Sequence, residues 1–153
     1  MTNNDVLRKI RYTFDYSDND MIKLFGQGDL EVNRAQISDW LKKEEDPEHI
    51  NLVDKHLAHF LNGFIVEKRG KRDGPPMKAE KTINNNIILR KIKIALNLKV
   101  EEMIEIFDQQ DFEISKHEIS AFFRKPTQSQ YRLCKDQFLR NFLMGMQKKY
   151  RPV

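Results

Sequence analysis

The chain has 153 residues, of which 39% are hydrophobic and 33% charged, and its formal net charge at pH 7 is +4. This length allows one domain or two small ones, and the periodic recurrence of the apolar residues argues against a disordered chain. No apolar run is long enough to cross a bilayer, and the single cysteine, Cys134, excludes an internal disulfide and favours a reducing cytoplasm.

The charge is distributed unevenly along the chain. Residues 1–70 hold 10 Lys/Arg and 13 Asp/Glu, residues 71–84 hold four and two, and residues 85–153 hold 13 and eight. The three segments therefore carry net charges of −3, +2 and +5. A polyanion would bind the second half and the connector in preference to the first half, although so small an excess does not require such a partner.

The sequence repeats itself at an offset of 82 residues without a gap, and 20 of the 66 pairs from Asn3 to Lys68 are identical. We therefore predict two homologous units, residues 1–69 and 83–153, joined by a flexible linker, residues 70–82. The linker is charged, nearly free of bulky apolar residues and interrupted by glycines and a proline pair, which is typical of an exposed loop. Because a lone core of this size is marginally stable, we expect the units to pack together.

Each unit is predicted to contain four helices. The first helix begins near Asn3 or Asn85, which are plausible N-caps, and the apolar residues that follow recur at intervals of three and four. The second helix of the first unit runs from about Ser17 to Phe25, and Ser17 with Asp20 resembles a capping box.

The third helix has the clearest start signal. Ser115 and Glu118 form a full capping box, and Asn33 and Gln36 occupy the same positions in the first unit. The helix ends in both units at a basic pair, Lys42-Lys43 and Arg124-Lys125. Such residues are favourable at a helix C-terminus.

The fourth helix is predicted to begin at Asp46-Pro47 in the first unit and near Thr127 in the second. It contains a glycine in both units, Gly63 and Gly145, which indicates a close approach between helices and makes this position a candidate for the place where the halves meet. No period-two alternation is long enough for a strand. The predicted fold is therefore all-α, with two four-helix units in tandem.

The second and third helices together resemble a helix-turn-helix DNA-binding segment in each unit. In that motif a capped, rigid helix presents its N-terminal residues to the major groove, and basic residues nearby contact phosphates. The nucleic-acid-binding residues predicted on this basis are Arg34, Gln36, Lys42, Lys43, Lys116, His117, Arg124 and Lys125. The first functional hypothesis is thus a nucleic-acid-binding or regulatory protein, with the more basic second unit dominant.

Two features favour an ordinary capped core helix instead. The turn over residues 27–32 is longer than the usual tight turn, and it carries acids in both units, Asp29/Asp111 and Glu31/Glu113. These acids stand where a phosphate would approach, and they would equally complement the helix dipole. The repeated pairs Arg8-Lys9 and Arg90-Lys91 leave the same alternatives open, namely phosphate binding or a solvated, ion-paired helix face.

The second functional hypothesis is a protein-interaction adaptor. An apolar groove between the helical units would bind a partner helix, or exposed aromatic and methionine side chains would do so. The candidates for such exposed positions are Tyr16, Met77, Met144 and Tyr150.

We predict no catalytic, metal or cofactor site, and do not expect an enzyme. His49, His56 and His59 lie on one helical stripe, but the second unit lacks them and no cysteine or clear carboxylate completes a tetrahedral metal site. Cys134 aligns with Leu52 and is expected to be a packed hydrophobe. Residues 115–118 contain serine, histidine and glutamate, but neighbours on one helical turn fan outward rather than converge as a triad.

The repeated motifs NN-x-x-LRKI, ISDWL/EISAFFRKP and DQFLRNFL-x-G resemble the bacterial YehS-like family, a domain of unknown function that occurs as a tandem pair. The resemblance covers nearly the whole chain and implies a small, cytoplasmic, all-helical bacterial protein. It implies no activity, ligand or catalytic residue. DNA and a protein therefore both stand as possible partners, a membrane partner is not expected, and the oligomeric state is left open.

Overall fold

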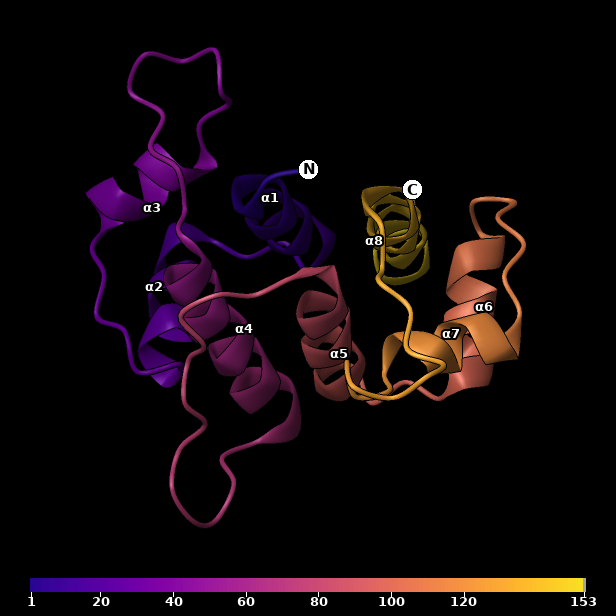
Figure 1. The fold of residues 1–153 in the computed structure, drawn as a ribbon. Coiled ribbons are helices and arrows are strands. Elements are labelled where there is room, and N and C mark those ends of the chain that lie inside the picture. Colours follow the sequence, from indigo (N-terminus) through magenta and orange to yellow (C-terminus); the bar gives the residue numbers. More distant parts are fainter. Residues whose placement is uncertain (153) are drawn as a thin grey trace.

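The computed structural model describes residues 1–152, and those residues form eight α-helices and no strand (Figure 1). The helices are α1 (Asn3–Thr13), α2 (Asp18–Gln27), α3 (Arg34–Leu41), α4 (Asp54–Arg69), α5 (Asn85–Ala95), α6 (Val100–Asp108), α7 (Lys116–Phe122) and α8 (Asp136–Tyr150). The predicted all-α fold is confirmed, with four helices in each repeat.

The two units meet through their first and fourth helices. Helix α4 packs against α5, and α1 packs against α8, while α2 and α3 lie on the outer side of one unit and α6 and α7 on the outer side of the other (Figure 1). We call these two inter-unit contacts the α4–α5 seam and the α1–α8 seam. Because α1 corresponds to α5 and α4 to α8, exchanging the units exchanges the seams. The units are therefore related by an approximate two-fold axis.

One continuous hydrophobic core runs through both units. Side chains from all four central helices are fully buried in it, including Leu7, Phe60, Leu89 and Phe142. Burial on this scale is the main favourable contribution to folding. Neither unit closes its apolar interior alone, as expected from the size of each half.

The predicted starts of the second and third helices are confirmed by their capping boxes. Ser17 Oγ accepts from Asp20 N at 3.1 Å, and Ser115 Oγ accepts from Glu118 N at 3.0 Å. The predicted caps of the first helix are wrong by one residue. Thr2 and Asn84 cap α1 and α5, so Asn3 and Asn85 are already the first helical residues. Their side chains are thereby free for the contacts described below.

The predicted start of the fourth helix is wrong by eight residues in the first unit. Helix α4 begins at Asp54 rather than at Asp46-Pro47, and α8 begins at Asp136 rather than near Thr127. Asp46 Oδ1 instead accepts a hydrogen bond from Glu48 N at 2.9 Å, which closes a turn rather than opening a helix. The chain then runs without regular structure to residue 53.

The repeated glycine does mark a close helix approach, but within each unit and not where the halves meet. A Cβ atom at Gly63 would lie 1.7 Å from the Leu24 carbonyl oxygen, and one at Gly145 would lie 2.0 Å from that of Ile106. Both distances are impossible for real atoms, so any larger residue would push α4 from α2, or α8 from α6. The glycines fix these two helix pairs.

Residues 70–82 form no helix or strand, as predicted for a connector. Two of its contacts were not predicted. Met77 packs against the hydrophobic core, and the Glu80 carboxylate lies 3.1 Å from Lys91 Nζ on α5. The part of the connector that leads into α5 thus lies along the α4–α5 seam. None of the described helices is long and apolar enough to span a membrane.

Candidate functional site

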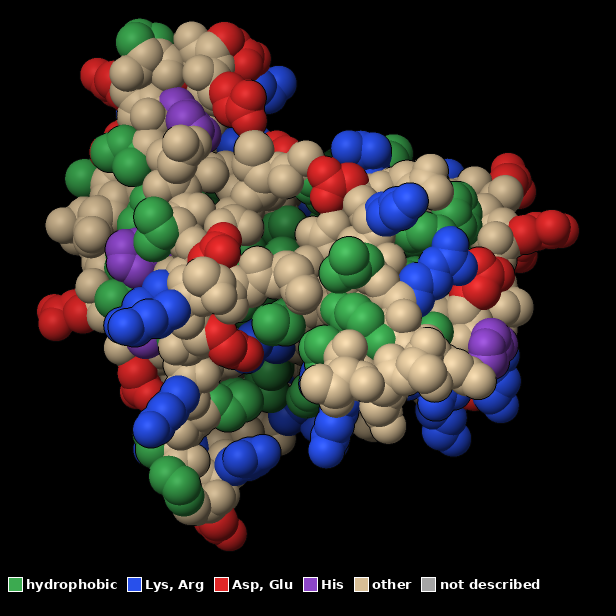
Figure 2. Space-filling model, viewed as in Figure 1, with side chains coloured by type: hydrophobic (Ala, Val, Ile, Leu, Met, Phe, Trp, Pro, Cys, Tyr) green, Lys and Arg blue, Asp and Glu red, His purple; other side chains and the backbone are tan. Residues whose placement is uncertain are grey.

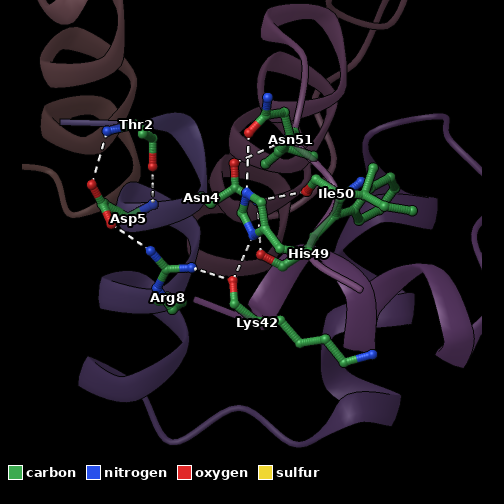
Figure 3. Close-up of polar contacts among 10 residues, drawn as sticks. Thr2, Asn4, Asp5, Arg8, Lys42, His49, Ile50 and Asn51 are labelled. Atoms are coloured by element: carbon green, nitrogen blue, oxygen red, sulfur yellow. Dashed lines mark hydrogen bonds and ion pairs between the residues drawn. The ribbon is translucent and has the colours of Figure 1, made fainter. Parts of the chain in front are cut away.

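A buried asparagine organises the segment between the third and fourth helices in each unit. Asn4 Nδ2 donates to the carbonyl oxygens of Trp40 and Ile50, both at 2.9 Å, and Asn4 Oδ1 accepts from Leu52 N at 3.0 Å (Figure 3). We call this arrangement the asparagine clasp. In the second unit Asn86 makes the same three bonds, to Phe122 O, Arg132 O and Cys134 N. The clasp explains why residues 50–53 do not join the fourth helix.

The repeated arginine of the first helix binds the end of the third helix. Arg8 Nη1 donates to the Lys42 carbonyl oxygen at 2.9 Å, and Arg8 also pairs with Asp5 (Figure 3). Arg90 Nη2 donates to the Phe123 carbonyl oxygen at 2.8 Å. A cation is favourable at a helix C-terminus, so both guanidinium groups have a structural role that explains their repetition.

A third repeated contact links the two units. Asp54 accepts from Asn3 Nδ2 in its own unit at 2.8 Å and from the backbone N–H of Ile83, which leads into the other unit, at 3.1 Å. Asp136 accepts from Asn85 Nδ2 at 2.8 Å and from the Met1 amino group at 3.0 Å. Met1 and Ile83 stand 82 residues apart, so these contacts are equivalent too.

The hydrogen bond from Asn85 and the charge of the Met1 amino group hold the pKa of Asp136 below its ordinary value. Both contacts favour the ionised carboxylate.

Each of the three histidines of the first unit contacts a different group. His49 Nδ1 lies 2.7 Å from the Lys42 carbonyl oxygen, and the ring of His56 lies 5.6 Å from that of Trp40 (Figure 3 shows His49). His59 Nδ1 contacts the Gly28 carbonyl oxygen. Within residues 1–152, no three His, Cys, Asp or Glu side chains are grouped so that they could hold a metal ion.

Two of the predicted nucleic-acid-binding residues lie at the exposed start of α3. Arg34 Nη2 donates to Asn19 Oδ1 at 2.7 Å. Gln36 Oε1 accepts from Asn33 N at 2.9 Å and so completes the capping box. Gln36 would have to leave this cap in order to read a base edge.

Two of the predicted lysines are already paired with carboxylates. Lys42 Nζ lies 2.9 Å from both Glu48 and Asp39, and the hydrogen bond to Glu48, followed by that to Asp39, raises the pKa of Lys42. Lys116 Nζ lies 3.0 Å from Glu101 Oε1. Each phosphate contact by these lysines would compete with an existing ion pair.

The remaining four predicted residues have no ion pair within the part of the chain that the structure describes. Lys43, His117 and Lys125 are exposed, and Arg124 is half-buried. The structure does not bring the eight residues together, because α3 and α7 lie on opposite sides of the four central helices (Figure 1).

The surface around the third helices is not basic. Residues 29–48 hold seven Asp/Glu and three Lys/Arg, a net charge of −4, and residues 111–130 hold three of each. Acidic side chains gather on the loop after α3, at the upper left of Figure 2. A polyanion would therefore meet repulsion at α3 and no net attraction at α7.

A cleft of about 1050 Å³ lies at the α4–α5 seam, between α4, the connector and the C-terminal half of α5. Its apolar lining residues are Ile65, Val66, Met77, Ile94 and Leu98, together with Pro75 and Pro76. Its basic lining residues are Arg69, Lys71, Arg72 and Lys93. The cleft thus combines an aliphatic wall with four cations, and Asp29 is the single acid that lines it within the described part of the chain.

The sequence indicated this cleft only in outline. Of the four candidate interaction residues, Met77 lines the cleft, whereas Tyr16 and Tyr150 are half-buried against the core. Met144 is 41% exposed, at the other seam. The net charge of +2 on residues 71–84 was the available signal for the basic lining.

Comparison with known proteins shows the family. The family model described as "Protein of unknown function (DUF1456)" matches residues 3–70 and again residues 85–151, so the chain belongs to this family and contains two copies of its domain. The chain is 42% identical over 147 residues to a protein of Escherichia coli (strain K12) called "Uncharacterized protein YehS", and the match covers 95% of this chain and 94% of that one. No solved structure matches. The predicted family resemblance is confirmed.

Proposed function

We propose that this member of the DUF1456 family is a protein-interaction adaptor rather than an enzyme. Its cleft at the α4–α5 seam binds an acidic, partly aliphatic segment of another protein. The observation that carries the proposal is the combination, in one cleft between the units, of an aliphatic wall and four cationic side chains.

The cleft offers both the apolar surface and the positive charge that such binding needs. Ile94 is 45% exposed in the free protein, so an aliphatic partner side chain would remove apolar surface from water on both sides. The cations on the connector and at the end of α4 are exposed, and they would attract acidic residues and select against basic segments.

An unpaired hydrogen-bond donor in the cleft wall fits the same ligand. Asn62 is 2% exposed and lines the cleft. Asn62 Oδ1 accepts from Lys91 Nζ at 2.6 Å, while its Nδ2 has no hydrogen-bond partner among the described residues. A buried donor without a partner is costly, and a carboxylate or carbonyl oxygen of a bound segment would satisfy it.

Single-stranded nucleic acid fits this cleft less well. Binding of unpaired bases depends largely on stacking against aromatic side chains, and no aromatic side chain from the described residues 1–152 lines the cleft. A peptide needs no such surface.

The test is selection from a random peptide library displayed on phage, with the full chain as bait. We expect enriched peptides that combine Asp or Glu with aliphatic residues, and we expect a double charge reversal, Arg69→Glu with Arg72→Glu, to abolish their binding. The matched control is Lys43→Glu with Lys125→Glu, which reverses the same charge away from the cleft and should leave binding intact. Enrichment of basic peptides, or equal loss in both variants, would show the proposal to be wrong.

Nucleic-acid binding through a helix-turn-helix-like third helix is the second candidate. The observation that favours it is the exposure of Lys43 and Lys125 at the same position in both units. Binding to mixed duplex DNA should then weaken steeply with salt and be lost in the Lys43→Glu/Lys125→Glu variant. The charge of the surrounding surface makes this the weaker candidate.

A further inference from the structure

The α1–α8 seam contains a cleft of its own, of about 460 Å³. Tyr12 and Met144 line it and are 44% and 41% exposed, which is high for side chains of this size. Lys9 and Arg140 line it as well, together with Arg8 and its ion-pair partner Asp5. Since Asp5 is paired with Arg8, the seam presents apolar surface beside two further cations.

The approximate two-fold symmetry equates this cleft with part of the cleft at the α4–α5 seam. At an offset of 82 residues, Lys9 corresponds to Lys91, Tyr12 to Ile94 and Met144 to Asn62. Ile94 and Asn62 line the α4–α5 cleft, and Lys91 bonds to Asn62. The two seams thus offer equivalent positions, one set on α5 and α4 and the other on α1 and α8.

At the α4–α5 seam the connector reaches the neighbourhood of these positions, while Ile94 stays 45% exposed. Met77 lines the cleft together with Ile94 and Asn62, and Glu80, three residues later, lies 3.1 Å from Lys91 Nζ. The chain itself shows which segment the seam accepts: an extended one, with an apolar side chain and then a carboxylate.

At the α1–α8 seam no residue from 1 to 152 supplies a carboxylate to the equivalent lysine. The Arg151 guanidinium carbon lies 4.1 Å from the centre of the Tyr12 ring, which nevertheless stays 44% exposed. Lys9 Nζ donates to Gln147 Oε1 at 2.8 Å and meets no carboxylate, and Arg140 is exposed without an ion pair. The surrounding contacts are nevertheless in place, since the Met1 amino group binds Asp136 as Ile83 binds Asp54.

We propose that the α1–α8 seam is a second docking site, which takes an extended segment of another protein that resembles the connector. The segment carries an apolar side chain that packs between Tyr12 and Met144, and a carboxylate three positions later that pairs with Lys9. The charge is complementary, because Lys9 and Arg140 are cations and the equivalent Lys91 already holds a carboxylate. This inference does not depend on a ligand at the α4–α5 cleft.

The connector sequence supplies the probe. A fluorescein-labelled peptide of residues 72–82 is titrated with the full chain, and its anisotropy is followed up to a protein concentration of about 1 mM. We expect saturable binding that weakens about tenfold when Lys9→Glu reverses the charge and about tenfold when Tyr12→Ala removes the apolar contact. Peptides with Met77→Ala or Glu80→Lys should bind correspondingly more weakly.

Two controls separate this site from its alternatives. Lys93 lines the α4–α5 cleft and not the α1–α8 cleft, so Lys93→Glu should weaken peptide selection at the first and leave binding of the connector peptide unchanged. Thermal denaturation checks that Lys9→Glu and Tyr12→Ala remain folded. The proposal is overturned by absence of saturable binding to the folded chain, or by binding that Lys9→Glu leaves unchanged. It is overturned equally by dimerisation of the chain that masks Tyr12, since the occupant would then be a second copy.

Discussion

Substitution of Asn4 by alanine tests whether the asparagine clasp holds the third and fourth helices of a unit together. The change removes three hydrogen bonds, and two of the partners left behind, the Trp40 carbonyl and the Leu52 N–H, lose a buried bond. An unsatisfied buried group costs about 1–3 kcal/mol. Since the Ile50 carbonyl is only partly buried and can turn to water, we expect a loss of about 3 kcal/mol.

Equilibrium unfolding in urea, monitored by circular dichroism, measures this loss as a shift of the midpoint at constant slope. Asn86→Ala should lose a similar amount, because Asn86 makes the same bonds. The matched control is Asn51→Ala, which removes an amide from the same loop whose one side-chain contact, to His49 Nε2 at 3.0 Å, is exposed to water. Loss of this exposed contact should change the free energy of unfolding by about 0.5 kcal/mol at most. An Asn4→Ala variant as stable as this control would refute the argument.

Three further predictions concern packing, pH and thiol reactivity. Gly63→Ala should lower the free energy of unfolding by about 3 kcal/mol or more, because the new Cβ would overlap the Leu24 carbonyl. Gly26→Ala has open space around it and should raise the free energy of unfolding by about 0.5–1 kcal/mol. Thermal denaturation compares the two variants. The pKa of Asp136 is lower in the folded than in the unfolded chain, so the ionised carboxylate stabilises the fold above the unfolded pKa. This stabilisation is lost as the pH falls through the folded pKa. The difference in free energy of unfolding between wild type and Asp136→Asn should therefore shrink in unfolding curves measured at acid pH. Burial raises the pKa of Cys134 to about 12, so iodoacetamide at neutral pH should label this thiol only when urea unfolds the chain. Mass spectrometry measures the labelling.

The sequence predicted the helices best where local chemistry determines the boundary. The capping boxes at Ser17 and Ser115 satisfy backbone donors within one turn, so they operate whatever surrounds them. The start of α4 was predicted wrongly because Asp46-Pro47 is an equally good local signal for a turn. The decision between turn and helix is made by Asn4, which is 48 residues away from the backbone N–H of Leu52 that it binds.

The candidate sites could be predicted far less well, for the same reason. The α4–α5 cleft joins residues from 26 to 98, which come from the end of α2, from α4, from the connector and from α5 and the residues after it, and no local pattern shows that Asn62 and Ile94 line the same cleft. The predicted nucleic-acid-binding residues were chosen from helix starts and ends. The sequence could not show that Lys42 and Lys116 face carboxylates, because Glu48 and Glu101 are brought to them by a loop and by a neighbouring helix.

The duplication separates contacts that the fold requires from contacts that only one unit makes. The asparagine clasp and the aspartate at the start of the fourth helix occur twice with equivalent partners, which is expected of contacts that every copy of this domain needs. The arginine also binds the end of the third helix in both units, although its acceptor, Lys42 O or Phe123 O, differs by one aligned position. The lysine of the first helix is identical in both units but has different partners, Gln147 for Lys9 and Asn62 with Glu80 for Lys91. Its identity therefore does not follow from one conserved contact. Both observations are explained if each seam holds a cation that pairs with a carboxylate wherever a segment supplies one. This explanation requires that Lys9→Glu lose binding of the connector peptide.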